Sequence, residues 1–275
     1  MEGIPVSDRS LQELLPDSLT SSFCVSLPTK AKVWVVAGML AHYLESFTDS
    51  VVVRDDNYEP VGVIGGKDII ERIIENPSSA FFDNTNVEEI MDKKFVVSME
   101  TKLRELIGIW KQTRRAFAII PNELHDYSAI STRKLLEIGW HCKTDVRISS
   151  LPKKKVLTFR KDDTARNIIN MMLENKTRRL LLENSSHFIN DRIIIEKIAE
   201  DLEYLRNTNH FLDIPASSFK LGDAKVVSED LTIPQSSKIL FDMPYPYLIY
   251  GDQVTSPWDI CLFLLSDELT EYEYV

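Results

Sequence analysis

Two aspartates follow short apolar stretches at points where the sequence predicts that a strand turns directly into a helix. Asp68 lies in the segment Gly62–Ile70, GVIGGKDII, and Asp259 lies in the segment Val254–Ile260, VTSPWDI. A carboxylate accepts strong, charge-assisted hydrogen bonds, and the first turn of a helix offers free N–H groups and a positive dipole end to anions. Such a turn therefore has the residue types of a small polar binding site.

The same spacing has a second, purely structural interpretation. In a capping box, a serine caps the start of the helix and an acidic residue three positions later reaches back to the backbone. Ser256 and Asp259 fit this pattern, so capping and ligand binding both remain open for them. Asp68 has Gly65 in place of the serine, and capping explains it less well.

The strand-to-helix turn belongs to a longer repeated unit. Weaker forms of the turn occur at 128–136, SAISTRKLL, and at 187–194, HFINDRII. Around each turn, apolar residues at helical or strand spacing predict the order strand, helix, strand, strand, helix. Four copies of roughly 55 to 65 residues indicate a repeat architecture. Each copy is too small to bury a strong core alone, so we expect the copies to pack in pairs.

The sequence thus predicts an α+β fold of four βαββα copies arranged as two pairs. The expected boundaries are 1–20 for an N-terminal segment, 21–141 for the first pair (copies 21–77 and 87–139) and 142–275 for the second pair (copies 144–205 and 211–268). The fourth copy is the most eroded, and its first helix, near 236–241, is expected to be short. Trp34 and Trp110 fall on the inner faces of their expected helices and are predicted to lie in the core.

Composition excludes several classes of protein. The net charge of −10, from 32 basic and 42 acidic residues, does not suit binding to nucleic acid or to anionic lipid. No stretch approaches the roughly 18 consecutive apolar residues of a membrane span, and the N-terminus lacks the apolar core of a signal peptide. Cys24, Cys142 and Cys261 are far apart without a Cys-x-x-Cys pair, which favours reduced thiols. We expect a soluble cytoplasmic protein.

A unit of this order that closes on Gly-apolar-apolar-Thr/Ser-x-x-Asp, present in tandem pairs, resembles the cystathionine-beta-synthase (CBS) domain. Ile90-Met91 before a strand is also similar to the way such repeats begin. The resemblance extends from about Leu19 to Leu265, and its specificity comes from fourfold recurrence of a short motif. It implies two Bateman modules that hold AMP, ADP, ATP or S-adenosylmethionine in clefts between paired repeats. It also implies a homodimer or an intrachain disc of four repeats.

In the CBS motif, the aspartate binds the ribose hydroxyls and the Thr/Ser supports the ligand, which suits a carboxylate facing a vicinal diol. Copy one keeps Gly62 and Asp68 but has Gly65 at the Thr/Ser position. Copy four keeps Ser256 and Asp259. The resemblance therefore implies ribose-binding carboxylates in copies one and four.

The other two copies depart from the motif. Copy two keeps Ser131 but has Lys134 at the aspartate position, and copy three keeps neither residue, with Asn190 and Ile193 instead. No ribose-binding carboxylate is expected in either copy. Lys134 is a candidate for contact with a ligand phosphate.

Two arginine pairs complement the aspartates. Arg114-Arg115 precedes a strand of copy two, and Arg178-Arg179 precedes the corresponding strand of copy three. In CBS proteins that bind phosphates, an arginine at this place often reaches the phosphate from across the pair. The resemblance thus implies one composite site per pair: Asp68 with the first arginine pair, and Asp259 with the second. The arginines also lie at helix ends, where cations satisfy the dipole. The run Lys153–Lys155 is expected to be a solvated turn, with contact to a ligand phosphate as the less favoured alternative.

The chain is therefore expected to be a non-catalytic sensor of adenosine compounds that regulates a separate partner protein. The alternative is a ligand-free interaction scaffold whose degenerate motifs are relics. No catalytic constellation and no metal-ligand spacing among the five histidines is visible, so neither an enzyme nor a metal site is expected.

Overall fold

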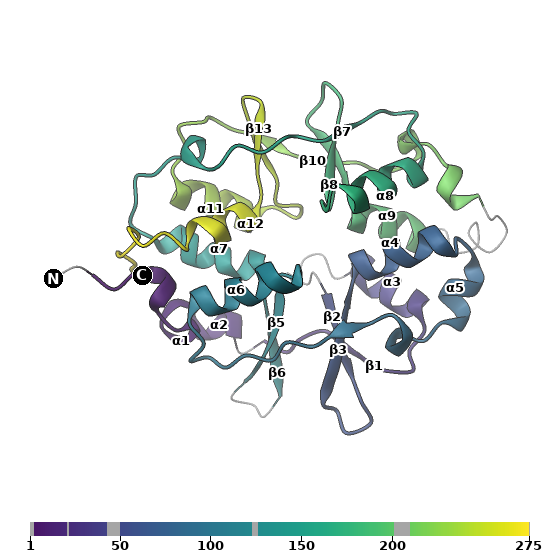
Figure 1. Ribbon diagram of the computed structural model, residues 1–275, viewed down its shortest axis with the longest axis horizontal. Coiled ribbons are helices and arrows are strands. Elements are labelled where there is room, and N and C mark those ends of the chain that lie inside the picture. The colour runs from purple at the N-terminus through teal and green to yellow at the C-terminus, as the bar shows by residue number, and fades with distance from the viewer. Residues whose placement is uncertain (1–2, 21, 43–49, 123–125, 201–209, 275) are drawn as a thin grey trace. The chain divides into compact units, whose positions relative to one another are not determined.

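A computed structural model describes residues 3–20, 22–42, 50–122, 126–200 and 210–274. Residue 21, the expected start of copy one, and residues 201–205, the expected end of copy three, lie outside these ranges. Figure 1 labels the helices and strands in chain order. Within the described residues, the predicted order of elements recurs in three copies, and in copy two a single β-bridge replaces the first strand.

Copies one and two occupy the first half of the chain. Copy one consists of β1 (Ser26–Pro28), α3 (Val33–His42), β2 (Ser50–Arg54), β3 (Pro60–Gly65) and α4 (Gly66–Glu75). Copy two consists of α6 (Leu103–Thr113), β5 (Phe117–Pro121), β6 (Tyr127–Ser131) and α7 (Thr132–His141). A single parallel bridge between Val96 and Ile119 takes the place of its first strand.

Copies three and four repeat the same order. Copy three consists of β7 (Thr158–Phe159), α8 (Ala165–Glu174), β8 (Arg179–Leu182), β9 (His187–Asn190) and α9 (Asp191–Glu200). Copy four consists of β11 (Lys225–Val226), α11 (Ile233–Asp242), β12 (Leu248–Tyr250), β13 (Gln253–Thr255) and α12 (Pro257–Phe263). The connecting segments carry η1 (Val6–Asp8), α1 (Leu11–Leu14), α2 (Asp17–Thr20), α5 (Ser79–Asn84), η3 (Val87–Glu89), β4 (Asp92–Lys93), η4 (Ile148–Ser150), η5 (Phe211–Asp213), η6 (Ala216–Ser218) and β10 (Gly222–Asp223).

The prediction of a short first helix in copy four is wrong. α11 has 10 residues, as many as α3 and α8. It begins three residues earlier than expected because Thr232 and Gln235 form a capping box. The Thr232 N–H donates to Gln235 Oε1 (3.0 Å) and the Gln235 N–H donates to Thr232 Oγ1 (3.4 Å). These side chains satisfy N–H groups that the first turn of a helix leaves free.

Sheet topology confirms the fourfold repeat. In copies one, three and four, the first strand runs parallel to the second and the second runs antiparallel to the third. In copy two, β5 and β6 pair antiparallel, and the parallel bridge at Val96 supplies the first position. A parallel connection requires a crossover, and α3, α6, α8 and α11 provide it. The α+β fold class is thus confirmed.

The chain forms two compact units that each combine non-consecutive copies. One unit comprises Met1–Cys24, Phe95–Lys155 and Ala224–Val275, and so contains copies two and four. Within it, α7 contacts α11 and α12. The other comprises Val25–Lys94 and Val156–Asp223, and so contains copies one and three, where α9 contacts α3 and α4. The pairing of copy one with two, and of three with four, stays a prediction.

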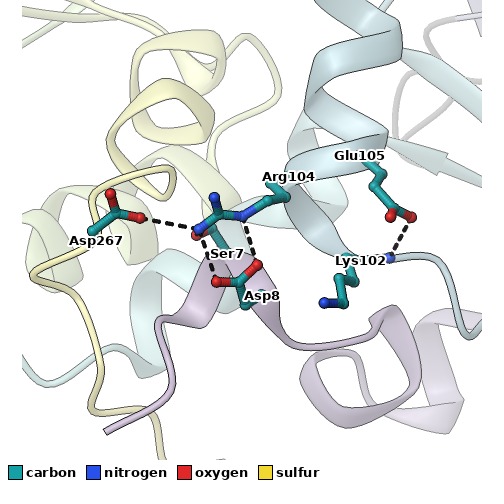
Figure 2. A network of polar contacts seen from close by, with 6 residues as sticks. All are labelled: Ser7, Asp8, Lys102, Arg104, Glu105 and Asp267. Carbon is teal, nitrogen blue, oxygen red and sulfur yellow. Dashed lines mark hydrogen bonds and ion pairs between the residues drawn. The ribbon is translucent and has the colours of Figure 1, made fainter. Parts of the chain in front are cut away.

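The N-terminal segment is an integral part of the first unit. Val6, Leu11 and Leu14 are buried in its core. The guanidinium of Arg104 in α6 fixes this segment from outside, because it pairs with Asp8 (2.7 Å) and Asp267 (3.0 Å) and also donates to Ser7 Oγ (2.8 Å) (Figure 2). Charged groups from α6, the N-terminal segment and the C-terminal segment thus meet at one guanidinium.

The two tryptophans assigned to the core behave differently. Trp110 is 1% exposed within the core of its unit, which confirms its prediction. Trp34 is 44% exposed, so its placement in the core was wrong. Val33, Val36 and Ala37 form the buried face of α3, and Trp34 lies beside that face. Cys24, Cys142 and Cys261 are buried free thiols, as expected.

Candidate functional site

The residue before each closing helix has the same backbone conformation in three copies. Its φ and ψ angles are −137° and −176° at Gly65, −125° and 170° at Ser131, and −129° and 170° at Ser256. All three are extended, so glycine is not required at position 65. The turn that the sequence motif predicts is therefore a common structural feature, and the copies differ in the side chains that they place on it.

In copy one, Asp68 is the third residue of α4 and is 8% exposed. Its Oδ2 accepts a hydrogen bond from the Gly65 N–H at 2.7 Å. Gly65 has no side chain, so only the acidic half of a capping box exists here. Asp68 nevertheless caps its helix, contrary to the interpretation that capping suits it poorly. This contact also fixes the direction of the carboxylate.

Gly62 in β3 is required by close approach of the neighbouring chain. A Cβ built at this position lies 2.9 Å from Met91 Cγ and 3.0 Å from the backbone oxygen of Asp92. Strand β4 pairs with β3 at this point, opposite Gly62. The motif glycine thus serves sheet pairing beside the turn.

In copy four, Asp259 takes the equivalent position in α12 and is 9% exposed. Its Oδ2 accepts hydrogen bonds from the N–H and the Oγ of Ser256, both at 2.9 Å. The capping interpretation is therefore correct for this pair. Its Oδ1 forms an ion pair with Lys154, and the Lys154 N–H donates to Gln253 Oε1 at 3.0 Å.

Sequence reasoning did not predict the contact between Lys154 and Asp259. The run Lys153–Lys155 was expected to be a solvated turn, yet one of its ammonium groups lies against the Asp259 carboxylate. The run precedes β7, the first strand of copy three, and lies more than 100 residues before Asp259. No local spacing connects the two, so only the tertiary structure identifies the contact.

Copy two presents a cation on the same turn. Lys134 is the third residue of α7 and is 7% exposed. Its ammonium donates to the backbone oxygen of Leu19 (2.6 Å) and to Ser22 Oγ (3.4 Å). Burial lowers the pKa of Lys134 to about 8, while nearby Cys24 opposes the shift. The stretch of chain before β1 thus supplies the partners of this charge.

Two further hydrogen bonds hold that segment against copy two. Ser128 Oγ donates to the backbone oxygen of Ser22 (2.6 Å), and the Cys24 N–H donates to the backbone oxygen of Tyr127 (3.0 Å). Residues that precede β1, the first strand of copy one, therefore lie along β6 and the start of α7, as Lys154 lies beside α12. In both cases, a segment that precedes the first strand of an odd-numbered copy contacts the motif residue of the following even-numbered copy.

In copy three, Asn190 caps α9, since its Oδ1 accepts from the Ile193 N–H at 2.8 Å. The next residue, Asp191, is 2% exposed, and sequence reasoning missed it. Its Oδ2 accepts a hydrogen bond from Arg178 Nε (2.8 Å) and forms an ion pair with Arg178 Nη2 (2.7 Å). The only sequence signal was an acidic residue in the first turn of a helix.

The pairs Arg114-Arg115 and Arg178-Arg179 lie in different local environments. Arg178 uses its guanidinium in the ion pair with Asp191, so a structural role is established for it. Arg179 begins β8. Arg114 ends α6 with a left-handed φ of 56°, and Arg115 is 8% exposed. Arg114 and Arg115 follow the C-terminus of α6, where positive charges interact favourably with the negative end of the helix dipole.

The predicted composite sites combine residues from both compact units. Asp68 belongs to the unit with copies one and three, whereas Arg114 and Arg115 belong to the other. Asp259 and the pair Arg178-Arg179 are divided in the same way. Both composite sites stay predictions. The cation that the structure places on Asp259 is Lys154.

Two kinds of site are not found within the described part of the chain. No group of three or more His, Cys, Asp or Glu residues there is arranged to hold a metal ion. Among the described helices, none has the length and apolarity needed to cross a membrane.

The protein resembles known proteins in its structure, whereas its sequence matches none of the families or curated proteins compared. Protein MJ1225 of Methanocaldococcus jannaschii, described as a proposed archaeal homolog of g-AMPK, is similar in structure with a TM-score of 0.76 and 14% identity. The match covers 92% of this chain and 99% of that one.

A second solved structure extends over a similar length. An uncharacterized conserved protein of Pyrococcus horikoshii matches with a TM-score of 0.53 and 11% identity, over 90% of this chain and 99% of that one. At such identities, structural likeness establishes the fold and leaves ligand and partner open. Together with the four βαββα copies and their shared turn, it shows that this chain has the fold of a CBS-domain protein with four repeats.

Proposed function

We propose that this protein is a non-catalytic sensor that binds adenosine compounds at the strand-to-helix turns of copies one and four. Asp68 and Asp259 would accept hydrogen bonds from the two ribose hydroxyls. Ligand binding would then shift the protein between two arrangements that a separate partner protein distinguishes. The description of MJ1225 as a proposed homolog of g-AMPK agrees with a regulatory role.

The observation that carries this proposal is the matched setting of the two carboxylates. Each is the third residue of a closing helix and less than a tenth exposed. In each, Oδ2 accepts the N–H of the residue that begins the turn, at 2.7 Å for Asp68 and 2.9 Å for Asp259. These bonds orient each carboxylate, whose remaining oxygen surface can accept from hydroxyl groups once weaker partners are displaced. A fixed acceptor loses little entropy when a ligand binds.

The remaining turns support a restriction to two sites. At the equivalent position of copy two, the buried ammonium of Lys134 donates to Leu19 and Ser22 of the same chain. A cation cannot accept hydrogen bonds from ribose hydroxyls. Copy three has the apolar Ile193 there. We therefore infer that copies two and three do not bind ribose through this position.

A ligand-free scaffold is the second candidate function, and one observation favours it. Asp68 and Asp259 both cap helices, which gives each a structural role that needs no ligand. On this alternative, the turns persist because they start helices. A binding experiment separates the two candidates directly.

The test is thermal unfolding with AMP, ADP, ATP and S-adenosylmethionine in parallel. A ligand at about 100 times its dissociation constant stabilises the native state by about 2.7 kcal/mol per site, a shift of about 5 °C for a chain of this length. A rise with at least one compound is expected. No rise with any of the four would instead favour the scaffold.

Asp68→Asn and Asp259→Asn then locate the sites. Each variant should weaken AMP binding at its own site by about tenfold, since a charged acceptor becomes neutral. Glu105→Gln is the matched control, because Glu105 Oε2 accepts from the N–H of Lys102 (3.3 Å) at the start of α6, outside the motif turns (Figure 2). If all three variants behaved alike, the assignment of the aspartates would be wrong.

A further inference from the structure

The copy-four turn carries a cation that its sequence motif does not contain. Lys154 is attached twice: its ammonium pairs with Asp259 Oδ1, and its backbone N–H donates to Gln253 Oε1 at 3.0 Å. Gln253 is the first residue of β13, two positions before the end of the strand that leads into the turn. The Lys154 side chain is 42% exposed, whereas that of Asp259 is 10% exposed. The lysine therefore covers the carboxylate from the solvent side.

We propose that Lys154 makes the copy-four site selective for adenosine compounds that carry phosphate, over uncharged adenosine and cationic S-adenosylmethionine. This inference rests on the proposed function, and it narrows the ligand class of that one site.

The argument follows from competition for Asp259 Oδ1. A ribose diol that binds this carboxylate takes an acceptor position now used by Lys154. The ammonium sits on a flexible four-carbon stem with three donors, so it can move and find a new partner. A ligand phosphate supplies that partner, because charge-assisted bonds between ammonium and phosphate are strong. Uncharged adenosine displaces the lysine without replacing its counter-charge.

A ligand with a positively charged sulfonium, such as S-adenosylmethionine, is disfavoured by the displaced ammonium. Its positive charge would lie near the displaced ammonium, and like charges at short distance repel. With Asp259 and Lys154 together, the turn has a balanced pair of charges before ligand arrives. Addition of an anion next to the ammonium is then favoured over addition of a cation.

In copy two, the segment that precedes β1 offers a group that suits the charge of the turn residue. The turn residue is Lys134, and the segment there offers the backbone oxygen of Leu19 instead of a cation. In copy four the turn residue is Asp259, and the segment offers the ammonium of Lys154. The segment before the first strand of copy one or three thus determines which ligand groups the turn of the following copy, two or four, can accept.

Calorimetric titration in the Asp68→Asn background tests the proposal, since copy four is then the tighter of the two proposed sites. AMP, adenosine and S-adenosylmethionine are titrated into that protein and into its Lys154→Gln and Lys155→Gln derivatives. Lys154→Gln should lower the ratio of AMP affinity to adenosine affinity by about tenfold. Lys155→Gln removes the same charge one residue away and should leave the ratio unchanged. An unchanged melting temperature verifies that each variant is folded.

Each outcome is decisive. A selective loss for AMP in Lys154→Gln, without loss in Lys155→Gln, supports the proposal. An unchanged ratio, an equal loss of AMP and adenosine, or an equal effect of both lysine variants overturns it and leaves the proposed function intact. Binding by the wild type but not by the Asp68→Asn protein also overturns it, because copy four is then no site. If none of AMP, ADP, ATP and S-adenosylmethionine binds the wild type, the proposed function fails as well.

Discussion

A rise in pH from 7 to 9 should stabilise the protein relative to its Lys134→Met variant. Lys134 is 7% exposed, and burial lowers its pKa from 10.5 to about 8. The unfolded chain therefore binds the proton more tightly than the folded one. Stability rises with pH wherever the unfolded state binds more protons. The penalty for charged Lys134 is fully present below pH 8 and disappears as the pH rises through 10.5.

The magnitude follows from the size of the pKa shift. A difference of 10.5 − 8 = 2.5 units corresponds to a penalty of about 3 kcal/mol at low pH. Integration of the proton linkage between pH 7 and pH 9 removes about 1 kcal/mol of this penalty. The hydrogen bonds to Leu19 and Ser22 contribute to stability in both protonation states, so they affect the difference less than the charge does.

Urea unfolding at pH 7, 8 and 9 measures this difference. Lys134→Met removes the titrating group but keeps an unbranched side chain, so other groups cancel in the comparison. Lys111→Met is the control, because Lys111 is exposed on α6 of the same unit, and its pH dependence should follow that of the wild type. If the free energy of unfolding changed with pH in the same way in the wild type and in Lys134→Met, the reasoning would be refuted. Lys134 would then either be solvated in the folded protein or be neutral already at pH 7.

Two further predictions concern packing and a buried charge. Gly139→Ala should destabilise the protein by about 1–3 kcal/mol, because the added Cβ would lie 2.5 Å from Ser237 Oγ between packed helices. Gly108 has open space around it, so Gly108→Ala should instead stabilise the protein by up to about 1 kcal/mol. Urea unfolding of both variants measures the two changes in the free energy of unfolding. Arg178→Ala should cost about 2 kcal/mol, because it removes the ion-pair partner of buried Asp191. A loss much smaller than 1 kcal/mol would show that Asp191 is protonated or satisfied by other groups.

The repeat and its turn could be predicted from the sequence because both depend on local order. Apolar periodicity determines where helices and strands lie, and the four copies were recognised although their motifs had diverged. Capping at Ser256 and Asp259 was also readable, since the box spans only four residues. Periodicity was less reliable for Trp34, because a residue at the margin of a helix face can turn to solvent.

The partners of the charged side chains were decided by tertiary structure alone. Lys154 with Asp259, Lys134 with Leu19, and Arg104 with Asp267 join residues more than 100 positions apart. No spacing rule connects such residues, because the connection depends on how separate copies and their preceding segments fold together. The sequence by itself determined which turns carry a carboxylate. Only the fold determined which charge stands beside each one, and this charge decides what a ligand would meet there.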